Sequence, residues 1–101
     1  MLLAEYQKQE NVIKKSIEVY GTDLQSTVCM EECAELIQAI SKIKRKGLND
    51  ELKDHLTEEI ADVLICTKML RLMYQIEDAE VDRWLEYKTN RQSERMKGGK
   101  E

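Results

Sequence analysis

Apolar and polar residues follow one another along most of this 101-residue chain with the spacing of amphipathic helices. Apolar side chains recur every three or four positions, so each such segment would present one apolar face. Gly21 and Gly47 interrupt the pattern where a helix is expected to end, and Asp78 is suited to begin another. The sequence therefore predicts an all-α, four-helix-bundle-like protein with helices over about residues 2–19, 23–46, 50–76 and 79–95.

The second and third predicted helices carry many of the apolar residues. The stripe of the second helix consists of Cys29, Cys33, Leu36, Ile37, Ile40 and Ile43. The third, expected either as one helix or with a break near residues 54–57, is apolar on nearly every side from Ile60 to Ile76. A helix with this pattern is normally surrounded by other helices. The three remaining helices are too short to cover it, so the pattern predicts a partner subunit and hence a dimer or higher homo-oligomer with this helix at its centre.

Composition narrows the class of protein further. The chain has no proline, no phenylalanine and only four glycines, which fits an all-α fold. Its length fits a single domain over residues 1–96, followed by an expected disordered tail at 97–101. A net charge of −4 provides no basic footprint for nucleic acid. No apolar run approaches the roughly 18 residues of a membrane span, so no membrane segment is expected.

Three cysteines, Cys29, Cys33 and Cys66, lie at apolar helical positions. An odd number of cysteines without a CxxC motif predicts reduced core residues in a cytoplasmic protein. A zinc site built from Cys29, Cys33 and His55 is the alternative, but that spacing matches no standard zinc pattern.

Two pairs of carboxylates stand out against this background. Glu32 and Glu35 are three residues apart in the second predicted helix, and Glu59 and Asp62 repeat the spacing in the third. Residues three apart share one face of a helix, where like charges cost a few tenths of a kcal/mol. A hard divalent cation between the pairs, Mg²⁺ or Mn²⁺, would offset this repulsion and could bridge to a phosphate-bearing substrate. The alternative is that both pairs are solvated faces of ordinary helices.

The surroundings of the acidic pairs add two expectations. Cys66, Met69 and Met73 continue the strip of Glu59 and Asp62, which predicts an apolar wall suited to a nucleobase or a subunit interface. Near the end of the fourth helix, Lys88, Arg91 and Arg95 share one face and could meet one polyphosphate. A solvated basic C-terminus is the other interpretation of these residues.

The acidic pattern resembles a known family. Glu31-Glu32-x-x-Glu35, twenty-three intervening residues and Glu59-x-x-Asp62 are similar to the motifs of the MazG-like nucleotide pyrophosphohydrolases, of the all-α NTP pyrophosphatase superfamily. Tyr20-Gly21 ahead of the first motif and Lys88-x-x-Arg91 after the second also fit. The resemblance covers roughly residues 15–95.

The resemblance implies a Mg²⁺-dependent enzyme, with Mn²⁺ as a substitute, that converts a nucleoside triphosphate to the monophosphate and pyrophosphate in nucleotide-pool house-cleaning. Four catalytic carboxylates would bind the metal, with Glu35 accepting the proton of the attacking water: Glu32, Glu35, Glu59 and Asp62. Four residues would bind the substrate: Lys88, Asn90, Arg91 and Arg95. Family members are commonly dimers or tetramers. Two alternatives stay open: a phosphoribosyl-ATP pyrophosphohydrolase-like enzyme, and a non-enzymatic helical oligomerisation or regulatory module.

Overall fold

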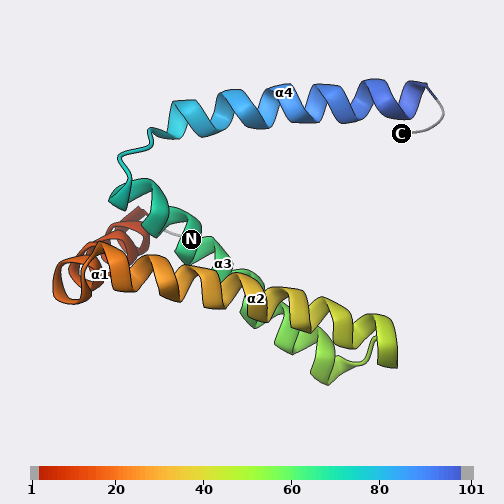
Figure 1. Ribbon diagram of the computed structural model, residues 1–101, viewed down its shortest axis with the longest axis horizontal. Helices are drawn as coiled ribbons and strands as arrows, with labels where there is room; N and C mark the ends of the chain where they lie inside the picture. The colour runs from red at the N-terminus through yellow and green to blue at the C-terminus, as the bar shows by residue number, and fades with distance from the viewer. Residues whose placement is uncertain (1–2, 99–101) are drawn as a thin grey trace.

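The chain folds into four α-helices joined by short connections, as Figure 1 shows. This computed structural model describes residues 3–98, and within that range it contains no strand. The helices are α1 (Leu3–Tyr20), α2 (Thr22–Lys46), α3 (Asp50–Met73) and α4 (Asp78–Lys97). The predicted all-α fold is confirmed. None of the described helices is long and apolar enough to cross a membrane.

The first two helix boundaries follow from glycine and from one side-chain cap. Gly21 and Gly47 have φ angles of 86° and 84°, a region that favours glycine because it has no Cβ. The Asn49 side chain accepts a hydrogen bond of 2.8 Å from the Leu52 N–H and so caps the start of α3. α3 then continues without a break through residues 54–57, which decides between the two predicted alternatives.

The end of α3 and the start of α4 differ from the prediction. α3 ends at Met73 rather than near residue 76, because Gln75 has a φ of 55° and turns the chain out of the helix. The N-cap of α4 is Glu77, not Asp78, and Glu77 forms a capping box with Glu80. α4 includes Lys97, the first residue of the predicted tail, and residues 99–101 lie outside the described part of the chain.

A small core lies where α1, α2 and α3 meet. α2 and α3 form an antiparallel helical hairpin, and α1 packs across it (Figure 1). Cys29, Cys66 and Met69 form the buried centre, with Ile13 and Ile17 of α1 packed against them. Burial of these side chains supplies the main stabilisation of the hairpin.

The packed face of α2 is narrower than the predicted stripe. Cys33, Ile37 and Ile40 are exposed, because α1 and α3 cover only the side of α2 that carries Cys29 and Ala39. The prediction that Cys33 belongs to the core is therefore wrong for the single chain. α3 likewise leaves Ile60, Leu64 and Ile65 exposed on the side away from α2.

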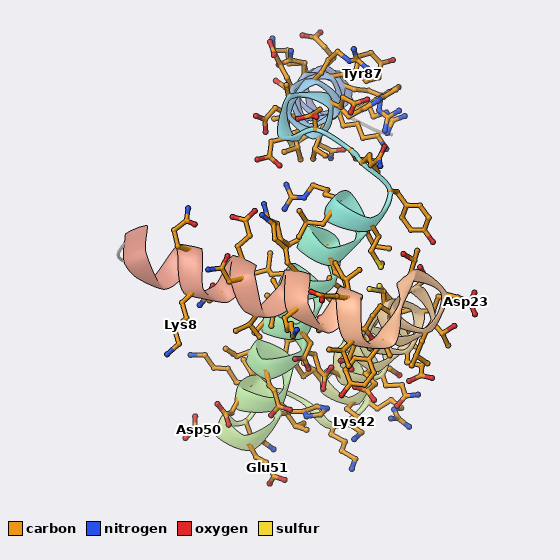
Figure 2. All side chains as sticks on the ribbon, turned by 90° about the vertical axis from the view of Figure 1, so that its left-hand side faces the viewer. Lys8, Asp23, Lys42, Asp50, Glu51 and Tyr87 are labelled. Atoms are coloured by element: carbon orange, nitrogen blue, oxygen red, sulfur yellow. The ribbon has the colours of Figure 1, made fainter. Side chains whose placement is uncertain are left out.

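The fourth helix does not close a bundle within one chain. α4 extends away from the other three helices in both views (Figures 1 and 2), and it contains no buried residue. Trp84, Leu85 and Tyr87 are each more than half exposed. Near its start, the Arg71 guanidinium lies 3.3 Å from the Asp78 carboxylate, so an ion pair ties α4 to α3.

Candidate metal centre

The helical hairpin brings the two predicted acidic pairs together. Glu32 and Glu35 project from α2, and Glu59 and Asp62 project from α3. Each of the four side chains offers a carboxylate oxygen, and these oxygens all lie within 4.8 Å of one another. Glu31 is exposed and stands outside this acidic cluster. The convergence matches the geometry expected from the two i,i+3 spacings.

Three of the four carboxylates, those of Glu32, Glu59 and Asp62, are partly or fully buried. Glu59 is only 3% exposed and Glu32 is half-buried, and one oxygen of each is inaccessible and has no hydrogen-bond partner. Glu35, by contrast, is exposed. A buried carboxylate without a partner is costly unless it is protonated or faces a positive charge.

The acidic cluster has altered proton affinities. Burial raises the pKa of Glu32 from 4.5 to about 7, and the charges of Glu35 and Asp62 raise it further in the same direction. Burial also raises the pKa of Glu59, again with contributions from Glu35 and Asp62. Glu32 and Glu59 therefore hold a proton more readily than solvated carboxylates do, unless a cation compensates their charge.

The chemistry of the donor set fits a hard divalent cation. All four side chains provide oxygen, the ligand that Mg²⁺ and Mn²⁺ prefer. The two orphaned buried oxygens, on Glu32 and Glu59, are groups that such a cation would satisfy. The exposed position of Glu35 leaves one side of the cluster open to solvent and to a substrate.

Buried sulfur-containing side chains pack between α2 and α3, close enough to the acidic cluster for the Glu32 charge to affect the Cys66 thiol. Cys66 and Met69 are buried next to Cys29, whose Sγ lies 3.7 Å from the Cys66 carbonyl oxygen. Burial raises the pKa of the Cys66 thiol to about 12, with smaller effects from Cys29 and Glu32. The thiol is therefore protonated at neutral pH and is a poor nucleophile.

The zinc alternative is not supported. In the described part of the chain, one group of three or more histidine, cysteine or acidic side chains is placed to share an ion, and it is the acidic cluster. Cys29, Cys33 and His55 are not brought together in that way. Their sequence spacing, which matched no standard pattern, gave the same indication.

The predicted substrate-binding residues lie apart from the acidic cluster. Lys88, Asn90, Arg91 and Arg95 are all exposed on α4, which runs separately from α2 and α3 (Figure 2). The Arg91 guanidinium lies 5.9 Å from the centre of the Tyr87 ring. The single chain therefore builds the acidic half of the expected site but does not add its basic half.

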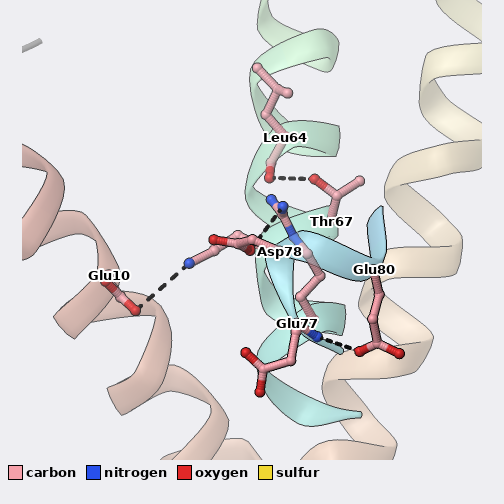
Figure 3. A network of polar contacts seen from close by, with 8 residues as sticks. Glu10, Leu64, Thr67, Glu77, Asp78 and Glu80 are labelled. Atoms are coloured by element: carbon pink, nitrogen blue, oxygen red, sulfur yellow. Dashed lines mark hydrogen bonds and ion pairs between the residues drawn. The ribbon is translucent and has the colours of Figure 1, made fainter. Parts of the chain in front are cut away.

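Sequence reasoning missed two ion pairs that join α3 to its neighbouring helices. Arg71 pairs with Asp78, and Glu10 of α1 pairs with Lys68 of α3 at 3.7 Å, in the polar network of Figure 3. No local pattern in the sequence distinguishes these charged residues from the many others in a chain that is 36% charged. These pairs form only because the fold brings α1 and the start of α4 next to α3.

Comparison with protein families identifies one match. A model of the MazG nucleotide pyrophosphohydrolase domain matches residues 23–92. This range includes both acidic pairs, Lys88 and Arg91, and it ends before Arg95. No curated protein and no solved structure matches the chain.

Proposed function

The chain belongs to the MazG nucleotide pyrophosphohydrolase family, and from this premise we propose that it is a Mg²⁺-dependent enzyme converting ribo- or deoxyribonucleoside triphosphates to monophosphates and pyrophosphate. The observation that carries the proposal is the acidic cluster with its two orphaned buried oxygens. Solvated surface carboxylates would face water and would have ordinary hydrogen-bond partners. The acidic cluster therefore supports a ligand role over a non-enzymatic helical module.

The exposure of each acidic residue indicates whether it would bind the metal or accept a proton. Glu32, Glu59 and Asp62 lie deeper and would hold the cation. When bound, Mg²⁺ would neutralise the triphosphate and orient a water toward the α-phosphorus. Glu35, the exposed member, is best placed to accept the proton of that water.

The basic residues of α4 would bind the leaving phosphates. Lys88, Arg91 and Arg95 provide positive charge on one side of the helix, and Asn90 can donate a further hydrogen bond. Since pyrophosphate leaves with increasing negative charge, cations at this position would stabilise the transition state as well as the bound substrate.

A panel of nucleotides with Mg²⁺ tests the proposed reaction. The products should be monophosphate and pyrophosphate, with EDTA as the blank. Replacing Glu35 by Gln should lower turnover on the order of a hundredfold or more, because each 1.36 kcal/mol of lost transition-state stabilisation is tenfold in rate. Glu31→Gln is the matched control, since this neighbour is exposed outside the acidic cluster and should cost far less.

Two results would contradict the proposal. Release of orthophosphate and a diphosphate would mean that a different bond is cleaved. Full activity of Glu35→Gln would mean that the acidic cluster is not the catalytic site.

Phosphoribosyl-ATP belongs in the same panel, because its pyrophosphohydrolase would use the same kind of cluster on the same kind of bond. No feature of the described residues favours that substrate over ordinary nucleotides.

The assembly and the setting form part of the proposal. Exposed Ile37 and Leu64, at 67% and 64%, leave more apolar surface than a stable monomer normally presents, so we expect a homodimer or homotetramer. Light scattering at micromolar concentration should give the mass of an oligomer, and a monomeric mass would contradict this expectation. The three free cysteines support a cytoplasmic role in nucleotide-pool house-cleaning.

A further inference from the structure

The fourth helix has too few contacts in its own chain to explain why it is helical. α4 has 20 residues, none of them buried, whereas most of the stability of helices in proteins comes from packing of one face against other elements. Its first half presents Trp84 and Leu85 at 55% and 58% exposure. Apolar side chains of this size on an otherwise charged helix indicate a surface that another element covers.

The same side of α4 changes from apolar to basic along its length. Val81, Trp84 and Leu85 come first, and Lys88 and Arg91 follow on the same side, one and two turns later. From residue 88 to residue 97 the helix carries four basic residues and one acidic residue, Glu94. This half is complementary in charge to the acidic cluster of α2 and α3.

The position of the charges along the helices also fits. At 1.5 Å per residue, Lys88 and Arg91 lie about 15 and 20 Å beyond Asp78, the first residue of α4. Asp62 and Glu59 lie about 17 and 21 Å before Met73, the last residue of α3. An α4 laid antiparallel against an α3 would therefore bring the basic residues level with the acidic cluster.

The linker holds α4 away from the α3 of its own chain. Gln75 has a φ of 55°, and the Ile76 N–H donates to the Arg71 carbonyl at 2.9 Å. The Arg71–Asp78 ion pair and the capping box of Glu77 then fix the first turn of α4 (Figure 3). These contacts direct α4 away from the body of the chain, so its basic half does not reach the acidic cluster that the same chain provides (Figure 2).

We propose that α4 is exchanged between two copies of this chain, so that Lys88 and Arg91 of one copy bind the phosphates of a nucleotide held at the acidic cluster of the other. Exchange of one element between identical protomers lets the partner satisfy contacts that the single chain leaves open. Trp84 and Leu85 would anchor the exchanged helix on apolar surface of the second copy. The inference rests on the proposed function for the identity of the substrate.

Complementation between two defective chains tests the exchange. One chain carries Glu35→Gln, and the other carries Lys88→Ala with Arg91→Ala. Each is co-expressed with a different affinity tag, and mixed oligomers are purified through both tags. Pyrophosphate release is measured below the KM of the wild type, where a loss of substrate binding lowers the rate.

The two arrangements predict different rates. With exchange, a mixed dimer contains one complete site, made from the intact acidic cluster of one chain and the intact α4 of the other, and one doubly defective site. Its activity should be about half that of the wild type, far above either parent. If α4 instead folds back on its own chain, no complete site exists and the mixed dimer stays as inactive as its parents. That result, or a fully active monomeric wild type, would overturn the exchange.

A second measurement tests the geometry without relying on activity. Equal amounts of ¹⁴N- and ¹⁵N-labelled wild-type chains are co-refolded and treated with a zero-length carbodiimide, which joins lysine to carboxylate. Exchange predicts cross-links between Lys88 and the acidic cluster in peptide pairs of opposite isotope label. Cross-links confined to pairs of one label, or no cross-link between these residues, would contradict exchange. A wild type that releases no pyrophosphate would refute the proposed function, while the isotope result would still decide the exchange.

Discussion

Binding of Mg²⁺ to the acidic cluster should release protons, and the number released follows from the structure. With a pKa of about 7, Glu32 in the metal-free protein carries ~0.9 proton at pH 6, ~0.5 at pH 7 and ~0.1 at pH 8. Glu59 adds to the release, because burial raises its pKa as well. A bound cation favours the ionised form of both carboxylates, so these protons leave when the metal enters.

The assay is calorimetric titration of the metal-free protein with MgCl₂ in two buffers that differ in ionisation enthalpy. At a given pH, the difference in observed heat between the buffers gives the number of protons released. The expected number is close to one or more per chain at pH 6 and falls as the pH rises toward 8, as the occupancy of Glu32 falls.

Two variants make this titration specific. Glu32→Gln cannot ionise and should lower the proton release at pH 6 by most of one proton. Glu31→Gln should leave the release unchanged, because this exposed residue lies outside the acidic cluster. Equal heats in both buffers at pH 6 for the wild type would refute the reasoning, since the carboxylates would then be ionised before the metal arrives.

Three further predictions concern the stability and reactivity of the same chain. In the metal-free protein the free energy of unfolding should decrease as pH rises from about 4.5 to about 7, because the folded state holds the Glu32 proton more tightly than the unfolded state. Denaturant titrations at several pH values should show this decrease, and a free energy that does not change with pH would contradict it. Iodoacetamide at pH 8 should label exposed Cys33 in the native protein and leave buried Cys29 and Cys66 unlabelled. Mass spectrometry counts the adducts, and all three cysteines should react in denaturant. Rapid labelling of Cys66 in the native protein would argue against its burial. Met69→Ala should lower the free energy of unfolding by roughly 2–4 kcal/mol, because this buried side chain lies at the centre of the core. A loss below about 1 kcal/mol in urea titrations would mean that Met69 is not tightly packed.

The acidic cluster could be predicted from the sequence because its geometry is mostly local. The i,i+3 spacing fixes the face that each pair shares, and a short connection after Gly47 makes the two helices antiparallel neighbours. The relative depth of the four side chains could not be predicted in the same way. The burial of Glu59, compared with the exposure of Glu35, depends on how closely α2 and α3 approach.

The direction of α4 could not be predicted from the sequence pattern, for a different reason. Its helicity and its cap region follow from local residues, whereas its direction depends on Gln75 at positive φ and on the ion pair between Arg71 and Asp78. Gln75 carries no glycine-like signal for a positive φ. The apolar stripe on α2 was predicted to be wider than the face that packs within the chain. The periodicity of Ile37 and Ile40 indicates an apolar face, but it cannot distinguish a contact within the chain from a contact with another subunit.

The turn that begins at Gly47 determines how the acidic pair of α2 aligns with the acidic pair of α3. Glu35 lies 11 residues before Lys46, the end of α2, and Glu59 lies 9 residues after Asp50, the start of α3. Glu32 and Asp62 lie 14 and 12 residues from the same helix ends. The two arms therefore differ by only two residues, about 3 Å along a helix, so the two pairs of carboxylates lie nearly level in the antiparallel hairpin. One residue inserted between Glu35 and Gly47 would shift the first pair by about 1.5 Å and rotate it by about 100°. A whole turn added to both arms would leave the acidic cluster assembled and only lengthen the hairpin beyond it, so tolerated changes in this segment should come in matched pairs.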